Sequence, residues 1–197
     1  SVEIEVNAGH GDPAVVIVGL PDAAVKESKD RVHTAISNSG FKPHVGRTTV
    51  NLAPANVKKE GPVFDLPIAI GMLATQGEIN AGALSHYCLL GELALSGEVR
   101  RVKGVLPIAM RARQDGRRGI IVPADNAEEA AVVEGIDVYP VRTLRQTADF
   151  LAGRLEQKPF RIDLTGVCDS INDYDEDYAD VKGQEQAKRA IEVAITG

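Results

Sequence analysis

The chain has 197 residues, of which 44% are hydrophobic and 25% charged, a composition typical of a globular protein with one domain of roughly 150 residues and an additional segment. It contains no apolar run of about 18 residues and no basic start followed by an apolar stretch, so it predicts neither a membrane span nor a secretory signal, and we expect a cytoplasmic protein. The two cysteines, Cys88 and Cys168, match no CxxC or zinc spacing and predict reduced thiols without a structural metal.

The acidic residues are unevenly distributed along the chain. The formal net charge of −6 argues against a simple nucleic-acid binder. However, seven of the 28 acidic residues lie between positions 163 and 180, where Lys and Arg are absent. Removing these seven leaves 21 acidic against 22 basic residues, so the rest of the chain is close to neutral. The seven are Asp163, Asp169, Asp173, Asp175, Glu176, Asp177 and Asp180.

The first forty residues predict two strands and an amphipathic helix. Residues 1–9 alternate apolar and polar side chains, which is typical of a half-buried strand, and residues 14–20 predict a second, more buried strand. Residues 19–41 follow a helical period, with Pro21 suited to the first turn. Oppositely charged residues four positions apart, such as Glu27 and Arg31, support this helix.

A third strand is predicted over 47–53, and the stretch "KKEGPVFDLPIAIGMLA" (58–74) then turns directly into an apolar helix. Asp65 is able to cap this helix, and Pro67 is tolerated only in its first turn. The helix has almost no polar face, so we expect it to be buried. The start of a buried helix directs unsatisfied N–H groups outward, and enzymes often place a nucleophile or an anion there.

The remainder predicts a partly parallel sheet followed by a second segment. Residues 87–102 resemble two short strands joined by a turn near Ser96 and Gly97. Strands and helices then alternate, which is the pattern of βαβ units and indicates a mixed α/β fold. The predicted elements are helices 105–116, 124–135 and 143–153 and strands 119–123 and 136–141. We expect a first domain over 1–153, an acidic linker over 154–180, and the first helix of a truncated module over 181–197.

The sequence lacks the usual metal and nucleotide motifs. Asp173, Asp175 and Asp177 have the alternate spacing that opens a calcium loop, but Tyr178 replaces its glycine and Gln184 its final glutamate. The four histidines form no HxxxH or HExxH pattern. Neither GxGxxG nor GxxxxGK[ST] occurs, so no nucleotide fingerprint is present.

A basic window between positions 100 and 118 is the main binding candidate. Several of its cations are expected to share an exposed strand end and helix face, as phosphate contacts require, and Asp115 is the only acidic residue among them. The window comprises Arg100, Arg101, Lys103, Arg111, Arg113, Arg117 and Arg118. The alternative is an ordinary solvated helix surface, and no interleaved aromatic residue supports base stacking. Lys58 and Lys59 are a second candidate.

Several long motifs resemble one family. "VGLPDAAVKES", "NLAPANVKKEG", "FDLPIAIGMLA", "LGELALSGEVRRVKGVLPIAM" and "VKGQEQAKRAIEVA" together are similar to the amino-terminal part of the ComM/YifB proteins, AAA+ ATPases also labelled magnesium-chelatase-like. The resemblance covers nearly the whole chain. It implies that the ATPase module begins around "DVKGQEQAKRA", with its phosphate loop beyond Gly197. ATP and Mg²⁺ are then cofactors of the full-length protein, and none is expected within this chain.

The first domain of that family is in turn similar to the proteolytic domain of Lon, which implies a Lon-like, ribosomal-protein domain 2-like fold. Lon carries a "DGPSAG" nucleophile loop before a buried helix, and "EGPVFD" places Val63 at the serine position. The catalytic lysine falls at Leu106. Neither side chain can attack a carbonyl or accept a proton, so the resemblance implies a catalytically inactive domain. The alternative pairs, Ser96 with Lys103 and Ser28 with Lys29, lie at no loop that enters a buried helix.

The resemblance implies an ATP-driven, hexameric DNA translocase that acts in branch migration during recombination or natural transformation. The domain itself is expected to contact DNA or to organise the hexamer. A second hypothesis is a purely assembling or regulatory domain that never contacts DNA. A serine peptidase lacks a nucleophile here, and a magnesium-chelatase subunit is supported by the family label alone.

Overall fold

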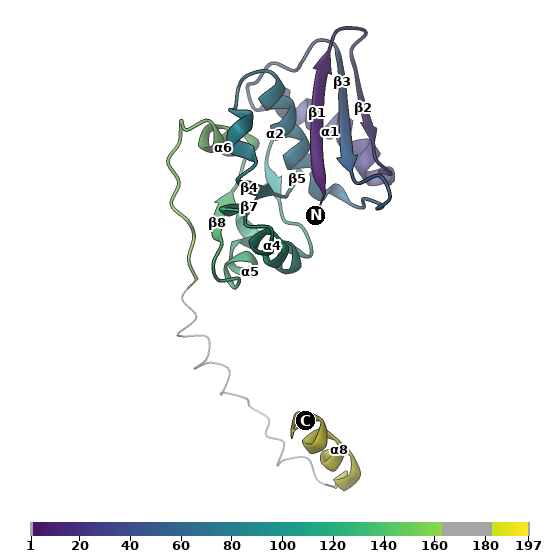
Figure 1. The fold of residues 1–197 in the computed structure, drawn as a ribbon, viewed down its shortest axis with the longest axis vertical. Coiled ribbons are helices and arrows are strands. Elements are labelled where there is room, and N and C mark those ends of the chain that lie inside the picture. The colour runs from purple at the N-terminus through teal and green to yellow at the C-terminus, as the bar shows by residue number, and fades with distance from the viewer. Residues whose placement is uncertain (1, 163–182, 197) are drawn as a thin grey trace. The chain divides into compact units, whose positions relative to one another are not determined.

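The computed structural model describes residues 2–162 and 183–196 (Figure 1). The chain separates into two compact units, Ser1–Ile162 and Asp163–Gly197. In the second unit the described element is helix α8 (Glu185–Thr196), which lies where the sequence predicts a new amphipathic helix. Most of the predicted acidic linker, including the DYDED segment, lies outside the described residues.

The first sheet has the strand order β1-β3-β2. Its strands are β1 (Glu3–Gly9), β2 (Ala14–Val18) and β3 (Arg47–Ala53). β1 is antiparallel to β3, whereas β2 runs parallel to β3. A parallel pair needs a long crossover connection, and helix α1 (Ala23–Asn38) supplies it between β2 and β3. These elements confirm the predicted strands and amphipathic helix, but β2 is not the more buried strand that was predicted, because its two end residues are exposed and the three between them are only partly buried.

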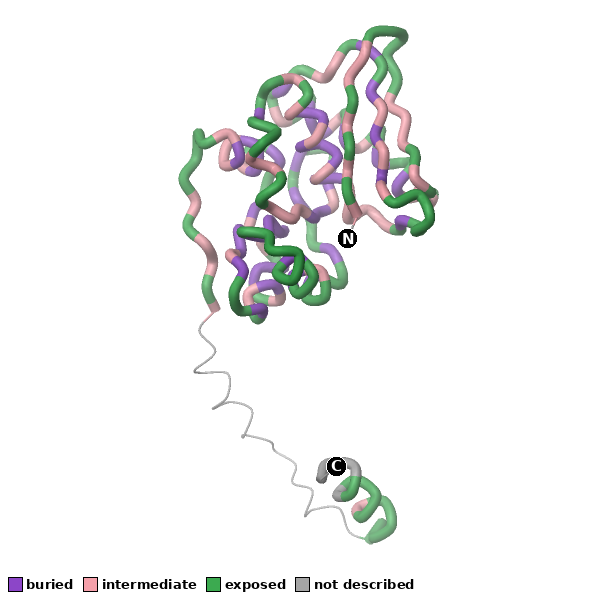
Figure 2. The backbone as a smooth tube through the Cα atoms, in the orientation of Figure 1, coloured by how far each residue is buried: buried purple, intermediate pink, exposed green. Residues whose placement is uncertain are grey.

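Helix α2 (Asp65–Thr75) packs against both β1 and α1 and is buried along most of its length (Figure 2). Leu66, Ile68 and Leu73 are fully buried, as the all-round apolar pattern predicts. The approach to β1 is close at Gly71, where an added Cβ atom would lie 2.6 Å from Val6 Cγ2. A side chain at position 71 would therefore push α2 away from the sheet.

The second sheet is parallel, with the order β4-β7-β8. It contains β4 (Tyr87–Leu89), β7 (Gly119–Pro123) and β8 (Asp137–Val141), with α4 (Val105–Gln114) between β4 and β7 and α5 (Ala127–Ala131) between β7 and β8. A separate hairpin pairs β5 (Glu92–Leu93) with β6 (Val99–Arg100). The prediction of two strands over 87–102 was therefore incomplete, because the stretch contributes one strand to the parallel sheet and two to the hairpin.

The remaining elements are short helices at the ends of strands and loops. They are η1 (Pro62–Phe64), α3 (Ala81–Leu84), η2 (Ala124–Asn126) and α6 (Leu144–Leu151). The helix predicted over 124–135 is shorter than expected, since a 3₁₀ turn precedes α5 and the helix ends at Ala131. The mixed α/β class predicted from the alternation of strands and helices is confirmed.

Two helix starts differ from the predicted capping. Asp22, rather than Pro21, begins α1 as its N-cap, and its Oδ1 accepts a 2.8 Å hydrogen bond from Val25 N–H. Asp65 does not cap α2: Phe64 occupies the N-cap position without a side-chain hydrogen bond. Asp65 is instead a fully buried first residue of the helix, and its carboxylate is directed to groups on other elements.

The buried apolar side chains form two clusters. The first lies among the first sheet, α1 and α2 and extends to Ile121 and Tyr139 of the second sheet. The second lies between the second sheet and helices α4 and α5. The loop that carries the expected nucleophile position lies between these clusters, because Leu66 belongs to the first and Val63 packs against the second.

Candidate functional site

Several backbone groups of the loop before α2 form hydrogen bonds with other parts of the domain. Gly91 N–H donates to Val63 O at 3.0 Å, and Leu66 N–H donates to Gly91 O at the same distance. Gly61 N–H donates to Asp22 Oδ2 at 3.1 Å. Three backbone groups around the expected nucleophile position are therefore satisfied by protein partners. An oxyanion site needs free donors, and these N–H groups are engaged.

The expected lysine position is occupied by Leu106 in the first turn of α4, where the side chain is partly exposed. Glu129 Oε1 accepts the N–H groups of Val105 at 2.9 Å and Leu106 at 3.1 Å. Asn126 donates to Glu129 Oε2 at 3.1 Å and also bonds both backbone groups of Val102. Burial alone would raise the pKa of Glu129, but these hydrogen bonds outweigh it and hold that pKa below its ordinary value. A carboxylate of the chain therefore caps α4 where the resemblance places a catalytic amine.

The alternative Ser–Lys pairs do not form a nucleophile either. Ser28 is fully buried, and its hydroxyl donates to Asp65 Oδ1 in a short hydrogen bond. Lys29, beside it in the sequence, is exposed on α1. Ser96 lies in the turn between β5 and β6, where its hydroxyl accepts from Glu98 N–H. In the described part of the chain, no hydrogen bond joins Ser96 to Lys103.

Asp65 is the centre of a buried polar network that sequence reasoning missed. Arg31 Nε donates to Asp65 Oδ2 at 2.9 Å, and Arg31 Nη2 donates to Oδ1 at 3.2 Å. Leu93 N–H also donates to Asp65 Oδ2, at 3.3 Å. The hydrogen bond that Arg31 donates to Asp65 raises the pKa of Arg31, and the negative charge of Asp65 adds to this effect, although burial lowers the pKa. The network links α1, α2 and the β5–β6 hairpin, and its partners are too far apart in sequence for a local pattern to reveal them.

The basic window divides into two groups at the ends of α4. Arg100, Arg101 and Lys103 precede the helix, whereas the other four cations lie in its last turn or between α4 and β7. All seven are exposed. Since an α-helix rises about 1.5 Å per residue, the ten-residue α4 separates the groups by roughly 15 Å. The structure does not bring the whole window together in one cluster.

Some cations of the window are already engaged. Arg111 pairs with Asp115 at 2.9 Å, and Arg100 lies 3.9 Å from Glu92. Arg117 donates to the backbone oxygen of Ser85. The other four, Arg101, Lys103, Arg113 and Arg118, form no ion pair within the described residues. Arg101 and Lys103 line a shallow open depression next to Glu129.

The second candidate pair requires a correction. Lys59 is only 1% exposed, and its ammonium group donates to the backbone oxygen of Pro54. Its backbone is also held, because Lys59 N–H donates to Leu20 O and Lys59 O accepts from Asp22 N–H. Lys58 is exposed and pairs with Glu60 at 2.7 Å. Lys59 is therefore not a candidate DNA contact, because a buried ammonium group cannot reach a phosphate.

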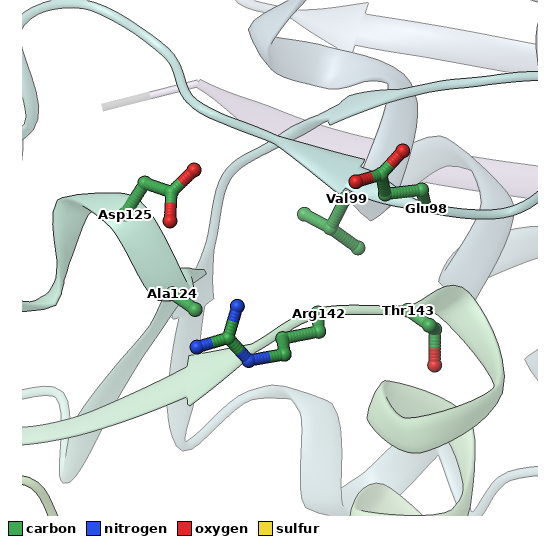
Figure 3. A pocket seen from close by; sticks show the side chains of 6 residues that line it. All are labelled: Glu98, Val99, Ala124, Asp125, Arg142 and Thr143. Carbon is green, nitrogen blue, oxygen red and sulfur yellow. The ribbon is translucent and has the colours of Figure 1, made fainter.

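A small pocket lies at the carboxyl ends of β7 and β8, where parallel sheets often bind ligands. It has a volume of about 300 Å³ and is lined by Glu98, Val99, Ala124, Asp125, Arg142 and Thr143. Figure 3 shows Arg142 extending toward Ala124, with Asp125 next to Ala124 on the same short helix and Glu98 beside Val99. Sequence reasoning missed this pocket. Polar residues directly after two predicted parallel strands were the signal that could have located it.

Neither a metal-binding cluster nor a membrane-spanning helix is found among the described residues. In the described residues, no group of three or more His, Cys, Asp or Glu side chains could hold a metal ion. No helix in the same ranges is both long and apolar enough to cross a membrane.

Comparison with known proteins identifies the family. The family described as subunit ChlI of Mg-chelatase matches residues 4–126, which is more than half of the chain, and the chain belongs to this family. Over the whole chain it is 42% identical to competence protein ComM of Haemophilus influenzae and 39% identical to YifB of Escherichia coli. It is also 44% identical to an uncharacterized protein of Mycobacterium tuberculosis. The resemblance to ComM and YifB is confirmed.

The chain spans 38% of the length of these curated relatives. A more distant similarity, 24% identity over 83% of the chain and 32% of the other protein, relates it to Lon protease 2 of Bacillus subtilis. DNA repair protein RadA of Halalkalibacterium halodurans is 30% identical over 53% of the chain and 22% of its own length.

Proposed function

We propose that this chain is the amino-terminal, non-proteolytic, Lon-protease-like domain of a ComM/YifB-type AAA+ ATPase, followed by a linker and the start of the ATPase module. The full-length protein would be a cytoplasmic, hexameric DNA translocase that uses ATP and Mg²⁺ for branch migration in recombination or natural transformation. The identity to a competence protein over the whole chain supports this proposal most directly.

The loss of proteolytic chemistry is part of the proposal. Val63 and Leu106 replace both groups of the expected dyad, and Glu129 caps the helix start beside Leu106. Phosphate-loop chemistry is also absent, because the 197 residues contain no GxxxxGK[ST] motif. The residues of this chain therefore do not fit a nucleotide site, and the domain would act by binding.

We assign the DNA contact to the cations that have no ion pair among the described residues. Arg101 and Lys103 lie in the loop between β6 and α4, and the side chains of Arg113 and Arg118 are exposed at the other end of the helix. Exposed cations that form no close ion pair can exchange their counterions for phosphates. The roughly 15 Å between the two groups suits contacts to separate phosphates of one nucleic acid.

The second candidate is an assembly domain without DNA contact. Its specific support is that Arg100, Arg111 and Arg117 already have protein partners, and that the chain outside 163–180 is nearly neutral. In that case the cations would contribute to surface solubility, and the domain would organise the hexamer.

Fluorescence anisotropy separates the two candidates. Single-stranded and branched DNA are titrated with the chain at low and moderate salt, beside the variant Arg101→Ala/Lys103→Ala. Lys26→Ala/Lys29→Ala is the matched control, because it removes two exposed lysines from α1. If the domain contacts duplex DNA, log K should fall by about 0.9 per log unit of salt for each phosphate contact, and the first variant alone should lose affinity. Absence of binding at low salt would contradict DNA contact and favour assembly.

A further inference from the structure

The segment that follows α6 lies along the outer edge of the second sheet. β8 pairs with β7 through a five-residue parallel register on one side. On the other side it meets one antiparallel bridge, between Val138 and Phe160, in which Phe160 N–H donates to Val138 O at 2.7 Å. Figure 1 shows this segment descending beside β8. Residues 154–161 therefore cover the β8 edge without forming a strand.

Three side chains of the segment attach it to the domain. At its start, Arg154 Nε pairs with Asp149 Oδ1 at 2.8 Å. In its middle, the Gln157 side chain donates to Pro140 O. At its end, Arg161 Nη2 pairs with Asp137 Oδ1 at 2.8 Å. The N–H groups of Arg154 and Leu155 also donate to Asp149 O of α6, at 2.8 and 3.1 Å, and Arg154 Nη1 donates to Glu78 O at 3.3 Å. Beyond Leu155, the remaining contacts are the side-chain contacts of Gln157 and Arg161 and the main-chain bond of Phe160, with the exposed residues Glu156 and Lys158 between them.

These contacts are weaker than those within the sheet. The side chain of Arg154 is 43% exposed and that of Arg161 is 69% exposed. Exposed ion pairs contribute little to stability, and salt screens them further. Phe160 is only partly buried where it packs against the second core cluster. The segment can therefore open at a lower free energy than the strands, as locally unfolding units do.

We propose that residues 154–161 are a strap that releases from the β8 edge and so lengthens the tether to the second unit. While the strap is attached, the domain holds the chain as far as Arg161, and the second unit begins after Ile162. Release adds eight residues to the covalent path, up to about 27 Å of extended chain. The strap itself is inferred from the contacts described above. Its role in changing the length of free chain between the domain and an ATPase module rests on the proposed function.

Residue-resolved amide exchange of the 197-residue chain tests the strap. At low salt, we expect Phe160 N–H to be protected but to exchange faster than the amides of β7. In about 1 M NaCl, or in the variant Arg154→Ala/Arg161→Ala, its exchange should accelerate by roughly three- to tenfold. The β7 amides should change by less than about twofold, because their register does not involve the strap.

The control variant is Arg111→Ala, which removes an ion pair of similar exposure far from the strap in sequence. It should leave the exchange of Phe160 unchanged. Two outcomes would overturn the proposal. If Phe160 exchanges only together with β7 at every salt concentration, the segment is a fixed part of the sheet. If Phe160 is unprotected even at low salt, no strap is present. Neither outcome depends on DNA binding or ATP hydrolysis, so the strap and the proposed function can fail separately.

Discussion

Removing the carboxylate of Asp65 should strongly destabilise the domain. Asp65 is fully buried and accepts hydrogen bonds from Arg31, Ser28 and Leu93 N–H. Removal of one partner of a buried ion pair costs about 3–5 kcal/mol, because the other charge remains without compensation. The side chain of Arg31 is 24% exposed and can recover part of its hydration, which places the expected loss near the lower end. We therefore expect Asp65→Ala to lose about 3 kcal/mol of unfolding free energy.

Urea unfolding followed by far-UV circular dichroism at neutral pH measures this loss. For a domain of this size, 1 kcal/mol corresponds to roughly 2–4 °C in melting temperature, so a shift of roughly 6–12 °C should accompany it. Asp65→Asn keeps an acceptor for Ser28 but loses the charge that faces Arg31, so it should lose less, about 2 kcal/mol. Arg111→Ala, which breaks the exposed pair with Asp115, should change stability by less than about 0.5 kcal/mol. If Asp65→Ala behaved like this control, the reasoning about the buried network would be wrong.

Two further predictions concern carboxylates that accept backbone N–H groups. Glu129→Ala should lose about 1–2 kcal/mol in urea unfolding, because Val105 and Leu106 lose their acceptor at the start of α4, whereas Glu128→Ala on the exposed neighbour should be nearly neutral. Acid should also destabilise the domain, since the pKa values of Glu129 and Asp22 lie below their ordinary values of 4.5 and 3.8 in the folded state. The stabilisation they supply is complete above these values and is lost as pH falls through the lower folded values, so melting temperatures should fall between about pH 5 and pH 2. Melting temperatures that stayed constant over this range would contradict these assignments.

The sequence predicted the regular elements well because their signals are local. Alternation identified the first strand of the first sheet, a short apolar run identified the second, and the all-round apolar pattern correctly predicted that α2 is buried. The lengths of helices were predicted less accurately. In the stretch 124–135, the structure begins with a 3₁₀ turn and the α-helix ends early, so the α-helix has only five residues. The pairing of β4 with β7 was not predictable from 87–102, because it depends on a strand 32 positions further along the chain.

The candidate site was less predictable because its decisive contacts are long-range. The spacing of Glu27 and Arg31 predicted a helical ion pair, and these groups do lie 3.8 Å apart. The stronger partner of Arg31 is Asp65, 34 positions away at 2.9 Å. Lys59 is a second example of a contact that local sequence does not predict. A lysine in a polar loop is expected to be exposed, but Lys59 is buried and its ammonium group donates to a backbone oxygen. Burial and pairing are properties of the assembled fold, and a local charge pattern does not contain them.

The loop before α2 can carry an apolar residue at position 63, because the backbone of the loop makes its contacts with the rest of the domain. Lys59 N–H and Lys59 O bind Leu20 and Asp22, Gly61 N–H binds Asp22, and Val63 O binds Gly91. Since none of these bonds involves the side chain at position 63, an apolar residue there is compatible with the same geometry. The backbone of the loop thus joins α1, α2 and the segment between β4 and β5, whichever side chain stands at position 63.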